Sequence, residues 1–133
     1  MIETCIPLAL KQQVVRTLLA DPYKIALYTK QASLGVNDGV YSPKGECDGS
    51  GYSAGGFQLT GAKAVIDGEF VCVTFDDAKW PYSSIKAAGA QVYNSRTKVV
   101  LATIAFGEEK ASSNGPFVVL MPKATREDAV FSI

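Results

Sequence analysis

The sequence predicts a mainly β domain, an antiparallel β-sandwich or a jelly-roll-like barrel, preceded by one amphipathic α-helix. Two observations carry this prediction. Short apolar runs separated by turn residues fill positions 23–133, and no helix-sized segments lie between them. The 133 residues suffice for a single domain, and 47% of them are hydrophobic. A chain of this size and composition can bury a core without a metal or disulfide to hold it together.

Residues 8–20 form the predicted helix. Its apolar residues recur at spacings near three and four, at Leu8, Leu10, Val14, Val15, Leu18 and Leu19. Pro7 fits the first turn of a helix, and Asp21-Pro22 ends it. Two positions for the apolar face are open: it packs on the sheet of its own domain, or it packs on a neighbouring subunit.

The texture changes to period two after Pro22. Tyr23, Ile25 and Leu27 alternate with other residues and are expected to face a core. Residues 30–56 then form a long loop rich in Gly, Ser, Asp and Asn, with room for a short strand near Glu46. A loop of this length in a small domain is more often functional or interface-forming than idle.

Short strand candidates alternate with turns through the rest of the chain. They are residues 57–59, 63–66, 69–75, 88–93, 98–106, 117–121 and 129–133. Asp67-Gly68 predicts one hairpin and residues 94–97 predict another. Residues 107–116 and 122–128 are expected to be connecting loops. The last five residues alternate apolar and polar, so they are predicted to be an integral strand and not a tail.

The composition excludes several classes of function. There is no histidine, which rules out a Ser-His-Asp triad, a Cys-His dyad and a His-ligated metal. Thirteen basic residues balance thirteen acidic ones, which argues against a nonspecific nucleic-acid binder. No segment has the character of a signal peptide or of a membrane span. We therefore expect no nucleic-acid or membrane partner.

The three cysteines are odd in number and lack Cys-x-x-Cys spacing. Neither a disulfide framework nor a zinc site is expected, and this usage suits folding in a reducing cytoplasm. Cys72 lies in an apolar run and is predicted to be a core residue, whereas Cys47 lies in the Gly-rich loop and could be an exposed thiol.

Two weak motifs could carry chemistry. Residues 49–54 match the letters of a dinucleotide-binding loop, but they lack the preceding strand and the following helix that would face a pyrophosphate. Asp76-Asp77 and the acidic residues of the long loop (Asp38, Glu46 and Asp48) have no spacing typical of a catalytic pair or a calcium site. We expect no enzyme activity, no catalytic residue, no cofactor and no metal.

Side chains for partner contacts are the remaining candidates. Tyr41 and Tyr52 lie in the polar loop, and tyrosine suits interfaces because it gives a large amphipathic contact area at low entropy cost. Trp80 fits a core anchor better than an exposed platform. The candidate contact residues are Leu10, Val14, Tyr41, Tyr52, Trp80 and Tyr82.

An ordered set of segments resembles a family of small virion proteins of tailed bacteriophages. The set spans residues 24–133, and no single member of it is specific. It comprises Lys24–Thr29, Gly51–Gly56, Trp80, Ala88–Asn94, Ala102–Gly107, Ser112–Phe117 and Phe131–Ile133. The helix at 8–19 also fits the pattern. The chain departs from the family's texture in the loop 34–50 and at Leu101–Ile104, so the resemblance implies a shared fold more than a shared partner surface.

The resemblance implies a non-enzymatic structural component of the virion, made in the bacterial cytoplasm and assembled into the particle. We expect a head-associated protein, either a capsid decoration or cement protein or a neck or collar subunit. Its expected partners are the major capsid or the neck and tail proteins, together with copies of itself as a homo-oligomer. The alternative is a tail or fibre module that binds host surface glycan through exposed aromatic side chains.

Overall fold

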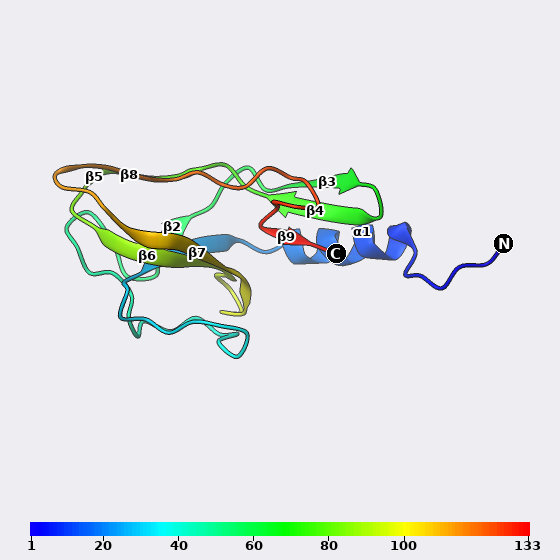
Figure 1. Cartoon of the computed structure of the whole chain (residues 1–133), viewed down its shortest axis with the longest axis horizontal. Coiled ribbons are helices and arrows are strands. Elements are labelled where there is room, and N and C mark those ends of the chain that lie inside the picture. The colour runs from blue at the N-terminus through cyan, green and yellow to red at the C-terminus, as the bar shows by residue number, and fades with distance from the viewer.

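The computed structural model describes all 133 residues and contains one helix and nine strands (Figure 1). The strands form three antiparallel sheets. The first sheet has the order β2-β1-β6-β7, the second β3-β4-β9, and the third pairs β5 with β8. The elements are α1 (Leu8–Leu19), β1 (Tyr23–Tyr28), β2 (Phe57–Gln58), β3 (Lys63–Asp67), β4 (Phe70–Thr74), β5 (Ala78–Ser83), β6 (Lys86–Asn94), β7 (Val100–Ala111), β8 (Gly115–Val119) and β9 (Phe131–Ser132).

The sandwich forms because one long two-stranded ribbon folds back on itself. β5 leads into β6 and β7 leads into β8, so the β5–β8 pair lies over the β6–β7 pair in Figure 1. The Ser112 hydroxyl holds this corner, where it donates to the Ser83 carbonyl and accepts from the Ile85 amide. Trp80 of β5 packs on Phe57 of β2 across the layers, with ring centroids 5.5 Å apart. The predicted sandwich is confirmed, and the sheets do not close into a barrel.

The other end of the molecule places α1 against the second sheet. The helix packs on β4 (Figure 1). Val15 is its one buried side chain. The helix ends one residue before the predicted end at residue 20, so its predicted span is confirmed to within one residue. Of the two predicted positions for its apolar face, the structure shows packing on its own domain. Residues 1–7 extend away from the body of the molecule and are exposed.

The long loop forms a third layer on the outer face of the first sheet. Tyr23, Ile25 and Leu27 face the main core as predicted, but Ala26 and Tyr28 on the opposite face of β1 are buried as well. They form a second small cluster with Tyr93, which loop residues such as Ala32 and Leu34 cover. The strand foreseen near Glu46 is reduced to a single bridge between Glu46 and Tyr28.

Most of the other predicted strands are present, with two corrections. β5 is missing from the predicted strands. It contains Pro81 and polar residues, which are uncommon in strands, and it is buried on one face only. The predicted loop 107–116 is mostly strand, since β7 continues to Ala111 along β6 and β8 begins at Gly115. The terminal strand is confirmed by the pairing of β9 with β4.

Candidate functional site

Glu46 is the centre of the most extensive side-chain network in the long loop. Its carboxylate accepts hydrogen bonds from the hydroxyls of Tyr41 and Tyr52 and, at 2.9 Å, from the amide of Gly55. The Tyr52 hydroxyl in turn accepts from the Leu27 amide of β1 at 3.0 Å. A single carboxylate therefore joins three points of the loop, and Tyr52 connects it to the sheet.

A second set of tyrosine contacts surrounds this network. Tyr41 stacks on Tyr93 with ring centroids 4.6 Å apart, and the Tyr93 hydroxyl donates to the carbonyl of Gly55. The Tyr28 hydroxyl donates to the carbonyl of Ser42 at 2.8 Å. Two strands of the first sheet thus reach out to the loop through phenol groups.

The electrostatics keep these phenols protonated. Burial raises the pKa of both Tyr41 and Tyr52, and the hydrogen bond to the Glu46 carboxylate raises it further. Burial and the nearby Glu46 charge raise the pKa of Tyr28 to about 12. A protonated phenol remains a donor, so the network keeps its hydrogen bonds across the physiological pH range.

Gly56 brings the end of the loop into contact with β1. Its φ of +89° lies in the left-handed region, and a Cβ atom there would lie 1.9 Å from the carbonyl oxygen of Ile25. Only glycine allows this close approach of two backbones. Gly49 and Gly51, which belong to the residues 49–54 that match the letters of a dinucleotide-binding loop, allow similar close approaches to the backbone of residues 82–85.

These contacts correct the expectation that Tyr41 and Tyr52 are exposed. Both hydroxyls are occupied by Glu46, and Tyr52 also packs on Trp80 with ring centroids 6.0 Å apart. The signal that could have revealed this is the position of Glu46, which is the only glutamate of the loop and lies between the two tyrosines. The exposed large apolar side chains of the loop are Val36 and Val40.

Helix α1 presents two different apolar faces. Val15 is 1% exposed against β4, whereas Leu10 is 50% and Val14 is 36% exposed. Leu10 and Val14 lie one turn apart on the same side of the helix, so they form a ridge that the domain leaves uncovered. We call Leu10 and Val14 the helix ridge. Together with Tyr82, the helix ridge is the part of the predicted contact set that lies at the surface.

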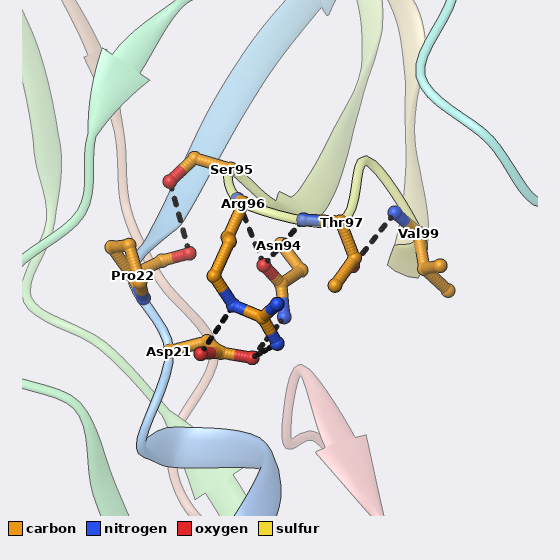
Figure 2. Close-up of polar contacts among 7 residues, drawn as sticks. All are labelled: Asp21, Pro22, Asn94, Ser95, Arg96, Thr97 and Val99. Atoms are coloured by element: carbon orange, nitrogen blue, oxygen red, sulfur yellow. Dashed lines mark hydrogen bonds and ion pairs between the residues drawn. The ribbon is translucent and has the colours of Figure 1, made fainter.

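A polar corner fixes the direction in which α1 leaves the sheet (Figure 2). The Arg96 guanidinium binds both carboxylate oxygens of Asp21, at 2.9 and 2.8 Å, and the Asn94 side-chain amide donates to the same carboxylate. The backbone and hydroxyl of Ser95 both donate to the carbonyl of Pro22. Hydrogen bonds from Arg96 and Asn94 lower the pKa of Asp21 to about 2. The end of the helix is thereby held to the turn between β6 and β7.

The two aromatic candidates of β5 differ in exposure although they are two residues apart, because the strand has a register irregularity between Trp80 and Ser83. Trp80 is buried in the core among Tyr52, Phe57 and Phe117, as a core anchor should be. Tyr82 is 85% exposed. Of the four aromatic side chains that a glycan site would use, Tyr82 alone is free at the surface, and the structure does not gather the others around it.

The remaining chemical candidates do not converge. Cys47 is buried, its thiol donates to the carbonyl of Lys86, and burial raises its pKa to about 11, so it is not the exposed thiol that was one of the two expectations. Cys72 is a core residue as predicted. Asp77 caps the amide of Met121 at 2.6 Å. No three His, Cys, Asp or Glu side chains lie close enough together to hold a metal ion.

No helix of the structure is long and apolar enough to cross a membrane. Comparisons of the chain with protein-family models, with curated proteins and with solved structures find no match. The surface itself is therefore the guide to function, and its distinctive part is the helix ridge with the extended residues 1–7 beside it.

Proposed function

We propose that this chain is a non-enzymatic structural protein of a tailed-bacteriophage virion, associated with the head as a capsid decoration or cement protein or as a neck or collar subunit. The observation that carries the proposal is the uncovered helix ridge of Leu10 and Val14, which continues into the exposed, extended residues 1–7. Apolar side chains left uncovered together at one end of a small domain are typical of a protein that docks.

The ordered resemblance over residues 24–133 supports the virion as the place of docking. The elongated shape adds to this support, because α1 and residues 1–7 lie at one end and the loop of residues 30–56 lies toward the other (Figure 1). A subunit of this kind gains its strength from many copies, each of which makes a modest contact.

The first test is the copy number of the protein in purified particles of the encoding phage, measured by quantitative mass spectrometry against the major capsid protein. Hundreds of copies indicate a capsid decoration. About six to a few dozen indicate a neck or collar, in line with closed ring symmetries. Absence from the particle overturns the proposal.

The second test asks whether the helix ridge makes the contact. The double variant Leu10→Glu with Val14→Glu puts charge on the ridge and leaves Val15 in place, so the domain is expected to fold and to lose binding to particles that lack the protein. Leu120→Glu is the matched control, because Leu120 is an exposed apolar residue that follows β8 and is not part of α1. Equal binding by both variants would show that the ridge is not the contact.

A further inference from the structure

β3 is an unprotected edge of its sheet. It pairs with β4 on one side and with no strand on the other, and residues 63–66 are exposed. The other edges are guarded at least in part: β5 and β8 contain Pro81 and Pro116, the end of β7 carries Glu108–Lys110, and β2 and β9 are two residues long. Proline, charge and shortness are the usual means by which sheets avoid pairing with other chains. β3 uses none of them in its centre, which is Ala64-Val65-Ile66.

The hydrogen bonds of β4 reveal which backbone groups of β3 are free. The amide and carbonyl of Val71 both pair with Ile133 of the terminal strand, so Val71 points away from β3. Phe70 and Cys72 must then point toward β3, where they oppose Asp67 and Val65. It follows that the N–H and C=O groups of Ala64 and Ile66 lie along the free edge.

We propose that β3 pairs with β3 of a second copy of this chain, antiparallel and centred on Val65. In this register Lys63 lies opposite Asp67 of the second copy, and Asp67 lies opposite its Lys63, so both ends of the pair are charge-complementary. Ala64 lies opposite Ile66, a small side chain against a large one. Val65 lies opposite its own copy on the two-fold axis, as an isologous interface requires.

The same register satisfies the free backbone groups. Ala64 and Ile66 of one copy exchange both N–H···O=C bonds with Ile66 and Ala64 of the other, because opposed residues of an antiparallel pair must both point into the gap. A shift of the register by one residue would place the free N–H and C=O groups of one copy opposite residues whose N–H and C=O groups already bond to β4. A shift by two would move Asp67 out of reach of Lys63, so the centred register is the one that meets both conditions.

The pairing also completes a groove beside the helix. A groove of about 380 Å³ runs between α1 and β3, lined by Val15, Arg16, Leu19, Ala64 and Ile66 among others. Ile66 of the second copy would lie on the α1 side of the joint sheet, beside Ala64, and fill part of it. The two three-stranded sheets would become one continuous sheet with α1 of each copy on the same face. This dimer does not depend on the virion, so a test of the dimer on the purified chain is independent of the test of the proposed function.

Sedimentation of the purified full chain tests the proposal. We expect a monomer–dimer equilibrium when the protein concentration is varied from about 1 μM to 1 mM. Val65→Glu should raise the dimer dissociation constant at least about tenfold, because it sets two carboxylates against each other across the axis. Val118→Glu is the matched control, since Val118 is 45% exposed on β8 and Val65 is 43% exposed. Circular dichroism establishes that both variants fold.

Three further variants test the register. Lys63→Glu alone should weaken the dimer, and Lys63→Glu with Asp67→Lys should restore it, because the charges are exchanged on both strands. Val65→Cys in a Cys5→Ser background should give a disulfide-linked dimer on oxidation, since opposed residues of a non-hydrogen-bonded pair are close enough for this bond. A wild-type chain that stays monomeric throughout, or a dimer that resists Val65→Glu, would overturn the proposal.

Discussion

The two ends of the molecule treat exposed surface in opposite ways. At the loop end, residues 30–56 are rich in polar side chains, yet Glu46 gathers hydrogen bonds from Tyr41, Tyr52 and Gly55 and turns the loop inward. At the helix end, α1 is an ordinary amphipathic helix, yet it leaves Leu10 and Val14 uncovered. The adjoining β3 leaves an edge open.

The difference teaches that loop composition is a poor guide to contact surface. Polar loop residues can satisfy one another, and once they do, they have little left to offer a partner. An apolar side chain cannot be satisfied by hydrogen bonds within the loop or helix that carries it, and it stays exposed unless another element covers it. The second sheet has three strands, and α1 packs on β4 with Val15 while Leu10 and Val14 stay uncovered.

Gly56→Ala should break the loop end most severely. The added Cβ meets the Ile25 carbonyl and the residue must keep a positive φ, which together should lower the free energy of unfolding by about 4 kcal/mol. Urea denaturation measures the loss. Gly35→Ala in the same loop is the control, because nothing lies within 4 Å of its added Cβ, and an equal loss in both variants would contradict the argument.

Glu46→Ala should weaken the packing of the loop on the first sheet, because it removes the carboxylate that accepts three hydrogen bonds from the loop. It leaves two partly buried phenols and one amide without their acceptor, so we expect a loss of roughly 3 kcal/mol in the free energy of unfolding. Faster amide exchange in residues 41–56 than in β1 would show that the loss is centred on the loop. Glu109→Ala is a matched control on an exposed part of β7, and it should change stability by less than about 0.5 kcal/mol.

Substitutions on α1 should separate its two faces. Val15→Ala removes buried methyl groups against β4 and should cost about 2 kcal/mol. Val14→Ala removes the same groups from the helix ridge and should change the free energy of unfolding by less than about 0.5 kcal/mol. Equal costs measured by thermal or urea denaturation would mean that the ridge is part of the core after all.

The smallest effect concerns the corner between α1 and the first sheet. The folded pKa of Asp21 is about 2, below its ordinary value of 3.8, so its contribution to stability is present above that ordinary value. The contribution is lost as the pH falls toward 2, when the carboxylate is protonated and releases Arg96. Asp21→Asn should flatten the pH dependence of unfolding in this window. An unchanged pH dependence would show that the ion pair does not hold the corner.

Several features could be predicted because they depend on local patterns. The period of α1, the turn at Asp67-Gly68 and the alternation in β1 each follow from residues close together in the chain. β5 escaped prediction because one of its faces is buried only after the ribbon folds over the first sheet, so its sequence has no clear alternation. Tyr41 and Tyr52 were misjudged for a similar reason: their partner, Glu46, lies within the same loop, and its role depends on how the loop returns to the sheet.

The residues alone determined the class of the fold, the single helix, most of the strands and the burial of Cys72, because periodicity and turn chemistry act over a few residues. Only the tertiary structure decided which of these surfaces would remain free. It buried one side of α1 and exposed Leu10 and Val14, drew the polar loop onto Glu46, and left β3 without a neighbour. Coverage depends on the width of a sheet and on the path of distant segments, which no local pattern of residues contains.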